Sequence, residues 1–354
     1  MQPIPVQRLH NQHLAGQRVG VVEVVAALGA MQAQDYAGGV WAVGLRAKTA
    51  TEAAVEAALA DGEILRTHPM RGTHHFVAKD DMRWMIGLFG QLMIKRIARR
   101  NRELDLDDKQ LAKALDVIAR ACEGGNHLDR AGVAAALTRA KISPEGQRIA
   151  HIIYRAELEG LVCSGRRKGK QVTIALFDER VPKSKPRTRE ESLADLARRY
   201  FTTRGPASER DFSWWCQLPA ADVREAIALA GDDLIAETID GTKLLRGAKT
   251  TKAAKGPRAY LLPPFDEYTV AYADRSHVGA PPATATTFNE RTMLGPNLVL
   301  DGQVIGSWKR TAGKKKVTIE LSPWQKVATK DRGALEEAAV RYAAFLGLEP
   351  DVRI

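Results

Sequence analysis

Two glutamines one residue apart, Gln32 and Gln34, are the polar side chains with the most suggestive spacing in this chain. They follow an apolar run of valine, alanine and leucine over residues 21–28, where a plain core helix would continue with Leu or Val. Side chains at i and i+2 point about 200° apart on a helix but share a face on an extended segment. If both amides act on one ligand, regular helix must therefore end near Met31. The alternative is that both amides bond to loop backbone.

Several common catalytic motifs are missing from the sequence. It contains no GxxxxGK[ST], no GxGxxG after a strand and no GxSxG, which disfavours phosphate transfer, Rossmann redox chemistry and a serine nucleophile on an elbow. His68, His74 and His75 could suggest a metal. Adjacent histidines on a strand face opposite sides, however, and no cysteine lies nearby. We therefore expect no metal site and no cofactor.

The composition is that of an ordinary soluble protein with a basic balance. Among 354 residues, Lys and Arg number 53 against 42 Asp and Glu, a net charge of +11, so a polyanion such as double-stranded DNA is the expected partner. Cys122, Cys163 and Cys216 are odd in number and form no CxxC pair, which predicts free thiols in a reducing cytoplasm. No apolar run reaches the roughly 20 residues of a membrane span. No secretory signal is evident at the N-terminus.

The basic residues occur in clusters at predicted loops and module edges, where long cationic side chains reach phosphates. The residues that we expect to contact DNA are Arg71, Arg148, Arg155, Arg166, Arg167, Lys168, Lys170, Lys309, Arg310, Lys314, Lys315 and Lys316.

Residues 105–180 have the element order of a winged helix-turn-helix. Helices are predicted over residues 107–121 and 129–140, and a third is predicted to begin at Ser143-Pro144, an N-cap followed by proline. This third helix has a basic face that includes Arg148 and Arg155. Strands at residues 161–164 and 171–177 enclose a cationic tip at 165–170. Winged helix-turn-helix modules contact DNA through the recognition helix and the wing.

The same order recurs at residues 186–248, with a less basic third helix. A helix at 191–203 ends before Gly205-Pro206, a capping box spans Ser208–Asp211, and a further helix follows Pro219. The strands after it turn at Asp240-Gly241, a strong hairpin dipeptide. Residues 1–104 form a degenerate version, with a helix at 50–60, strands at 64–68 and 73–77, and an apolar helix after Asp80.

Residues 256–354 are predicted to be mainly β, after a linker at 247–258 that we expect to be mobile. Strands are predicted at 259–262, 297–300, 303–309 and 316–321, with an Asp301-Gly302 turn and a basic tip at 310–315. A small barrel or half-barrel fits this pattern. The closing helix at 331–346 has one apolar stripe, which we expect to be core packing.

Four landmarks together resemble the AlkZ-like bacterial DNA glycosylases, which unhook interstrand crosslinks and excise bulky alkylated bases. The resemblance covers nearly the whole chain, and the landmarks occur in the family's order. They are Gln32-Ala33-Gln34-Asp35, Arg66-Thr67 with Met70 to His74, Gly205-Pro206-Ala207 with Asp211-Phe212, and Asp274-Arg275-Ser276.

The resemblance implies an α+β fold of three tandem winged helices, at residues 1–104, 105–180 and 186–248, followed by a small C-terminal β-barrel with a closing helix at 256–354. It also implies that Gln32 and Gln34 are catalytic, since Gln-x-Gln is the signature of one branch of the family. Asp35 is the nearest carboxylate and a fallback base, although capping of the following turn is its other role.

The chemistry expected of two glutamines is hydrolysis of a bond that is already weak. Alkylation at N7 of guanine or N3 of adenine makes the base cationic and a good leaving group, so a strong general acid is less necessary. Amides can orient water and offer a carbonyl dipole to the developing oxocarbenium centre, but they cannot take a proton. Weak activity on undamaged bases is therefore expected.

The sequence thus favours a monofunctional DNA glycosylase, working as a cytoplasmic monomer on alkylated or crosslinked duplex DNA. A non-catalytic winged-helix transcriptional regulator is the main alternative, and a nucleoid or repair scaffold is another. Whether the tip at 166–170 or the tip at 310–316 probes the minor groove is left open. A regulator would usually dimerise to match a two-fold operator, and no dimer helix is evident.

Overall fold

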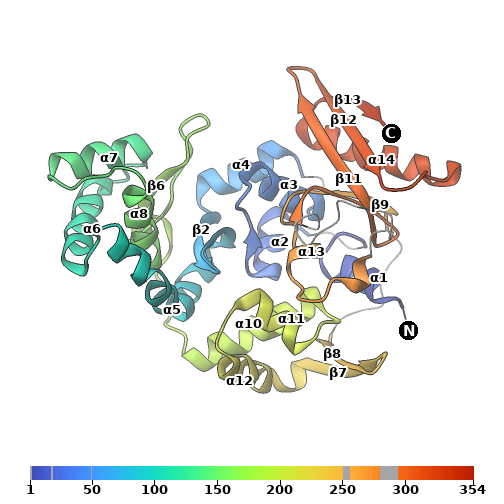
Figure 1. Cartoon of the computed structure of the whole chain (residues 1–354), viewed down its shortest axis with the longest axis horizontal. Helices are drawn as coiled ribbons and strands as arrows, with labels where there is room; N and C mark the ends of the chain where they lie inside the picture. Colours follow the sequence, from blue (N-terminus) through green and yellow to red (C-terminus); the bar gives the residue numbers. More distant parts are fainter. Residues whose placement is uncertain (1, 17–18, 49, 250–255, 280–293) are drawn as a thin grey trace. The chain divides into compact units, whose positions relative to one another are not determined.

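The computed structural model describes residues 2–16, 19–48, 50–249, 256–279 and 294–354 (Figure 1). The chain divides into two units. Unit 1 comprises Met1–Glu56 with Leu193–Ile354, and unit 2 is Ala57–Ser192. Both contain helices and strands, so the predicted α+β class is confirmed. Part of the expected linker at 247–258, residues 250–255, lies outside the described residues.

Unit 1 begins with three helices and a two-residue strand: α1 (Ile4–Asn11), α2 (Val21–Leu28), β1 (Met31–Gln32) and α3 (Tyr36–Arg46). Helix α2 stops at Leu28 because Gly29 adopts a φ of 75°, which a residue with a side chain rarely adopts. The prediction that regular helix ends before the two glutamines is confirmed.

Helix α3 was not expected from the sequence. Gly38, Gly39 and Gly44 lower its intrinsic helix propensity, yet tertiary packing leaves no room for a side chain at Gly44. A Cβ added at Gly44 would lie 2.2 Å from Cε2 of Phe345, on the closing helix. Trp41, one turn earlier, packs its ring 4.9 Å from that of Phe345. Close approach between these two helices therefore accounts for the glycine.

The second copy of the predicted repeat has the expected elements: α10 (Arg189–Arg204), α11 (Glu209–Cys216), α12 (Ala220–Ala230), β7 (Leu234–Ile239) and β8 (Thr242–Gly247). The predicted capping box is present, with Ser208 and Asp211 each accepting from the other's backbone N–H. Strands β7 and β8 pair as an antiparallel hairpin. Rings of Tyr200, Phe212 and Trp215 pack between α10 and α11.

The C-terminal half-barrel is confirmed as a five-stranded sheet in the order β13-β12-β11-β10-β9. Its strands are antiparallel except that β12 and β13 are parallel. Helix α14 packs against β9 and β13, and its predicted apolar stripe is buried. The elements are β9 (Ala259–Leu262), α13 (Glu267–Val270), β10 (Asn297–Leu300), β11 (Gln303–Ala312), β12 (Lys316–Pro323), α14 (Thr329–Leu346) and β13 (Glu349–Arg353).

Two details of this sheet differ from the sequence-based expectation. Strand β11 continues to Ala312, so Arg310 lies within the strand rather than in the tip. Strand β13 was not expected, because its parallel partner β12 lies beyond an entire helix in the chain. Such non-local pairing leaves no local signal in a five-residue segment.

Unit 2 contains the hairpin β2 (Ile64–Met70) and β3 (Thr73–Ala78), and the long helix α5 (Met82–Glu103). A helical module follows, with a sheet in the order β4-β6-β5. Helix α4 (Glu52–Asp61) spans the division between the units. The module comprises α6 (Asp108–Cys122), β4 (Leu128–Asp129), α7 (Arg130–Arg139), α8 (Arg148–Leu158), β5 (Val162–Ser164), β6 (Thr173–Leu176) and α9 (Phe177–Arg180).

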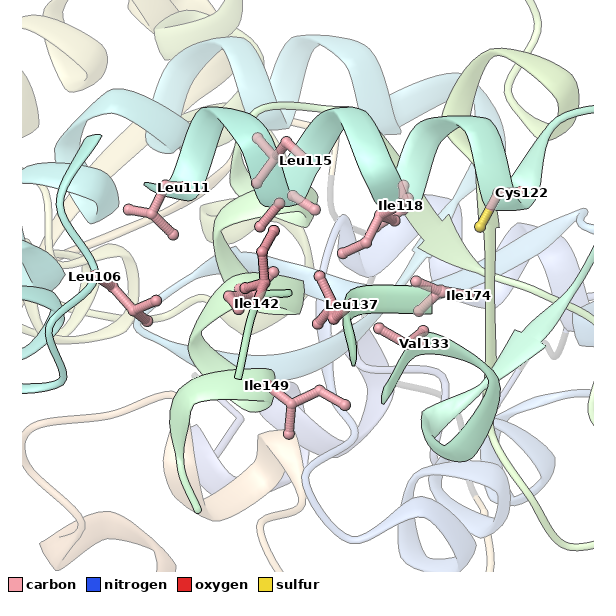
Figure 2. Packing of buried hydrophobic residues seen from close by; sticks show 14 residues of the cluster. Leu106, Leu111, Leu115, Ile118, Cys122, Val133, Leu137, Ile142, Ile149 and Ile174 are labelled. Carbon is pink, nitrogen blue, oxygen red and sulfur yellow. The ribbon is translucent and has the colours of Figure 1, made fainter. Parts of the chain in front are cut away.

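An apolar core joins the three helices of this module to its sheet. Figure 2 shows Leu115 and Ile118 of α6 near Leu137 of α7, with Ile174 of β6 close by. All of these side chains are at least nine-tenths buried. The order of helices and hairpin is the one predicted for residues 105–180, and the number of tandem winged-helix modules remains a prediction.

One boundary in this module was predicted wrongly. The third helix was expected to begin at Ser143-Pro144, whereas α8 begins at Arg148. Gly146, with a φ of 58°, interrupts the helical conformation between the two positions.

Substituting two helical glycines tests the packing of α3 against α14. Gly44→Ala should destabilise the protein by about 1–3 kcal/mol, because the added methyl overpacks against Phe345. Gly333→Ala, in α14 with no atom within 4 Å of the new Cβ, should stabilise it by about 0.5–1 kcal/mol through helix propensity. Denaturant unfolding measures both changes, and effects of the same sign would contradict the close approach.

Candidate active site

Gln32 lies in β1, and its backbone is held by a carboxylate from a distant part of unit 1. Its N–H donates to Oε1 of Glu267 at 2.9 Å. The side chain is half-buried, and its Oε1 is fully buried yet accepts no hydrogen bond from any described residue. An unsatisfied buried acceptor costs about 1–3 kcal/mol. This oxygen is therefore a point where an incoming donor or cationic group would be favoured.

Glu267 forms a buried ion pair with Arg204. Oε2 of Glu267 accepts from Nη2 of Arg204 at 2.6 Å and from Nε at 3.0 Å, and both side chains are at most 1% exposed. The same oxygen accepts from Nε1 of Trp215 at 3.1 Å. The Arg204 guanidinium also lies over the Trp215 ring, 4.4 Å from its centroid. Because four N–H groups donate to this buried carboxylate, its side chain is held in one orientation.

Arg204 also ties down the chain immediately before Gln32. Its Nη1 donates to the carbonyl of Leu28, and its Nη2 to the carbonyl of Ala30, both at 3.0 Å. The two carbonyls flank Gly29, where helix α2 has ended and its last C=O groups lack helical partners. The guanidinium therefore supplies the donors that the helix end requires and fixes the path of the backbone into β1.

A second buried ion pair holds helix α3, which follows Gln34. Arg46 and Asp266 pair through two bonds, Nη1 to Oδ2 at 2.8 Å and Nη2 to Oδ1 at 2.7 Å, and both side chains are fully buried. Nη2 of Arg46 also donates to Oε1 of Gln12. Consecutive acidic residues, Asp266 and Glu267, thus anchor the chain on both sides of the glutamine segment.

Gln34 and Asp35 lie in the bend between β1 and α3, and both are exposed. Asp35 is the N-cap of α3, and its Oδ1 accepts from the N–H of Gly38 at 2.5 Å. A side chain at Gly38 would meet that carboxylate and Pro263, with its Cβ 2.7 Å and 3.2 Å away. Asp35 therefore caps α3, which is one of the two roles expected for it. Its role as an auxiliary base stays a prediction, as do the catalytic roles of Gln32 and Gln34.

Sequence reasoning missed the four residues of the two buried ion pairs. Their partners are 63 and 220 positions apart, so no spacing connects them. Two local signals were available. Asp266-Glu267 follows Pro263-Pro264-Phe265 beside an apolar strand, and Arg46 ends an otherwise uncharged helix. Charged residues in such apolar surroundings are buried only when paired.

The other family landmarks in unit 1 contact one another. Oδ1 of Asp211 accepts from the N–H groups of Ala273 and Asp274, at 2.9 and 3.1 Å. Hydrogen bonds from the backbone and hydroxyl of Ser276 lower the pKa of Asp274. The carbonyl of Pro206, after a cis peptide bond from Gly205, accepts two bonds from the buried guanidinium of Arg8. Within unit 1, these contacts join α11 to the segment after α13, and α1 to the loop before α11.

The basic residues predicted to contact DNA fall into two groups. Some are engaged within the fold. Arg148 donates to the carbonyls of Ser143, Leu104 and Asp105, and Arg155 pairs with Glu159 at 2.5 Å and Asp108 at 3.6 Å.

Three further arginines also have partners that the fold supplies. Arg71, at φ 60° in the β2–β3 turn, lies 2.8 Å from Nε2 of His75. Arg310 donates to Oη of Tyr342. Nη2 of Arg167 donates to the carbonyl of Lys170. Because these arginines already contact groups within the fold, they are weaker candidates for phosphate contacts.

The second group is exposed. In the tip between β5 and β6, Arg166 is 64% exposed and pairs with Asp61 at 3.2 Å, and Lys168 and Lys170 are exposed. On the β11–β12 hairpin, Lys309, Lys314 and Lys315 are exposed, and Lys316 lies 3.6 Å from Asp351. These lysines carry most of the support for DNA contact.

The adjacent histidines His74 and His75 of the β2–β3 hairpin lie on opposite sides of the strand, as expected. His75 is buried and hydrogen-bonds to the carbonyl of Thr73. His74 lies against His68, with ring centroids 3.7 Å apart. Burial, with the nearby charge of Arg66, lowers the pKa of His74 to about 2, so its imidazole is neutral.

Removing one partner of the Arg204–Glu267 pair tests its importance. Glu267→Gln should cost about 3–5 kcal/mol of unfolding free energy, because it leaves a buried guanidinium without its counter-charge. Glu320→Gln is the control, since Glu320 lies 3.9 Å from Arg353 in an exposed pair, and should cost at most about 1 kcal/mol. Denaturant unfolding measures both, and equal losses would contradict the assignment.

Within the described residues, no helix has the length and apolar character needed to cross a membrane. Comparison with known proteins agrees with the resemblance drawn from the landmarks. The family model described as DNA glycosylase AlkZ-like matches residues 25–345. The interstrand DNA cross-link repair glycosylase of Streptomyces sahachiroi is 23% identical over 303 residues, 81% of each chain.

The solved structure of Streptomyces sahachiroi DNA glycosylase AlkZ matches with a TM-score of 0.79 at 18% identity, covering 98% of both chains. At this identity the structural match shows a shared fold. The family model matches the sequence itself, over residues 25–345. The protein therefore belongs to the AlkZ-like DNA glycosylase family.

Proposed function

We propose that the protein is a monofunctional DNA glycosylase acting as a monomer on duplex DNA. Its substrates are purines made cationic by alkylation, N7-guanine or N3-adenine adducts, including those that join two strands. Family membership and the relative named for interstrand cross-link repair support this class of substrate. The single observation that carries the site is the buried, unsatisfied Oε1 of Gln32 on a backbone held by Glu267.

The proposed reaction needs little acid or base catalysis. As the C1′–N bond breaks, its electron pair neutralises the cationic base, which leaves without protonation. Water adds to C1′ and releases its proton to solvent. Positive charge develops at C1′ and O4′ of the sugar. A carbonyl dipole aimed at that charge stabilises the transition state more than the ground state.

In this scheme Gln32 supplies the carbonyl dipole and Gln34 orients the water. Gln32 suits the first role because its oxygen is buried, where a dipole acts in a low local dielectric. Gln34 suits the second because it is exposed and reachable by solvent. Asp35 is engaged with the N–H of Gly38, so we assign it to positioning the start of α3 and not to proton transfer.

Rigid support of Gln32 is part of the proposal. Displacement of a catalytic group by about 1 Å costs on the order of 10²-fold in rate. The backbone of Gln32 is fixed by Glu267, and the residues before it by Arg204. Holding a neutral amide in place, rather than a carboxylate, restricts useful rates to bases that are already good leaving groups.

Contact with DNA is proposed for the exposed lysines of two hairpin tips. They are Lys168 and Lys170 in the tip between β5 and β6, and Lys309, Lys314 and Lys315 on the β11–β12 hairpin. Exposed ammonium groups bind phosphates without reading sequence. Such binding suits an enzyme that searches for lesions in any sequence context.

Base-release assays on alkylated DNA test the catalytic assignment. DNA containing N7-methylguanine is incubated with the protein and treated with alkali, which breaks the strand at abasic sites. Gln32→Ala and Gln34→Ala should each lower the single-turnover rate by at least about 10²-fold, the scale of losing one oriented stabilising group. Gln325→Ala, a change at an exposed glutamine after β12, should leave the rate unchanged.

The same variants distinguish a glycosylase from a non-catalytic transcriptional regulator. A transcriptional regulator would bind one operator far more tightly than random DNA, would release no base, and would be insensitive to both glutamine substitutions. Absence of strand breaks above the Gln32→Ala background would reject the glycosylase proposal.

Salt dependence tests the hairpin lysines. Combining Lys314→Ala with Lys315→Ala should weaken binding to random duplex DNA. It should also flatten the slope of log K against log salt by about 0.9 for each phosphate that the protein no longer neutralises. The paired change Lys326→Ala and Lys330→Ala, at exposed lysines elsewhere in unit 1, is the charge-matched control. Equal slopes for the two double variants would remove the hairpin from the interface.

A further inference from the structure

Unit 2 contains a cluster of three metal-ligating side chains that the glycosylase proposal does not use. His68 and His74 come from the β2–β3 hairpin, and Glu157 comes from α8. One potential ligand atom from each lies within 4.8 Å of the other two. His68 Nδ1 is in hydrogen-bond contact with Oε2 of Glu157.

A bulge in the hairpin creates the histidine pair. Thr67 pairs with His75 and Met70 with Thr73, so His68 and Pro69 together lie opposite the single residue His74. A bulge of this kind re-aims side chains that regular alternation would separate. It brings the rings of His68 and His74 to a centroid distance of 3.7 Å, and leaves His75 on the other, buried side.

Glu157 completes the cluster from the buried side. Its side chain is only 5% exposed, and a buried carboxylate requires a positive or hydrogen-bonding partner. Tyr154, whose ring lies 4.5 Å from that of His68, has a buried Oη with no hydrogen-bond partner among the described residues. The carboxylate, the two imidazoles and this hydroxyl thus form one polar cluster of oxygen and nitrogen atoms.

We propose that His68, His74 and Glu157 bind one divalent transition-metal ion of the Zn²⁺ class. Two imidazole nitrogens and one carboxylate oxygen form a donor set that zinc accepts, with water in the fourth position. Metal–ligand bonds of about 2.0–2.1 Å would place tetrahedral ligands roughly 3.4 Å apart. The three side chains therefore need to close by little more than about 1 Å.

The surroundings provide both access and a limit on affinity. The cluster lines a groove of about 340 Å³, which gives an ion a route from solvent. Arg66 and Arg130 line the same groove, and their charges oppose a dication. We therefore expect micromolar affinity and a structural role. The ion would join the β2–β3 hairpin to α8 within unit 2. This inference does not depend on the glycosylase proposal.

The test uses the full chain, stripped of metal with a chelator and titrated with ZnCl₂ by calorimetry. One equivalent should bind with a Kd in the micromolar range or tighter. Co²⁺ should give visible d–d absorption of a site with nitrogen and oxygen ligands. His74→Leu and Glu157→Gln should each weaken binding at least about tenfold, since even loss of an outer-shell partner costs 10–100-fold.

His151→Gln is the matched control, because His151 lines the same groove but is outside the cluster. It should bind Zn²⁺ as the unmodified chain does. Circular dichroism checks that each variant is folded, and the Co²⁺ spectrum of the unmodified chain remains informative if one is not. Absence of stoichiometric binding, unchanged affinity in both ligand variants, or equal loss in the control would overturn the proposal. A simple histidine–carboxylate pair would then account for the cluster.

Discussion

The buried pair of Arg204 and Glu267 is the interaction on which the arrangement of unit 1 depends. One carboxylate receives the guanidinium, an indole N–H and the backbone N–H of Gln32, while the guanidinium bonds two carbonyls at the end of α2. Desolvating two charges is costly, and the cost is offset only when nearly every donor and acceptor is satisfied. Such a pair permits one geometry. The strand that carries Gln32 inherits that geometry, and Asp266 with Arg46 imposes the same restriction on the helix that follows Gln34.

This rigid support explains how neutral amides could serve as a catalytic site. A glutamine has no charge to attract the sugar and no basicity to activate water, so its effect depends on position. A site of this kind discriminates by leaving-group ability, because it adds modest stabilisation to a bond weakened by alkylation. Among the basic residues, those that bond within the fold must likewise be distinguished from those that are exposed. Several arginines that were predicted to contact phosphates, among them Arg148 and Arg155, bond instead to backbone carbonyls or carboxylates. The net charge of +11 therefore overstates the cationic surface free to meet DNA.

Local chemistry made much of the fold predictable. Helix α2 ends where a glycine adopts positive φ, α11 begins at a capping box, and Asp240-Gly241 and Asp301-Gly302 form the expected turns. The apolar stripe of α14 is buried as its period predicted. Predictions failed where a distant partner decides, or where a glycine takes a positive φ that the sequence does not reveal. Helix α3 has a glycine at position 44 because Phe345 lies against it, β13 exists because β12 offers a parallel edge, and α8 begins late because Gly146 has positive φ.

By itself, the sequence determined that Gln32 and Gln34 follow a helix end, that the chain is basic, and that its landmarks resemble one glycosylase family. Those properties reside in neighbouring residues and in composition, which can be read without contacts. Only the tertiary structure brought Glu267 to the backbone of Gln32, Asp266 to Arg46, and His68 to His74 and Glu157. Each juxtaposition joins segments whose sequence separation carries no signal, or depends on a bulge that shifts register by one residue. Burial then gives these contacts their strength, because charges and amides removed from water interact strongly only where the fold has excluded the solvent.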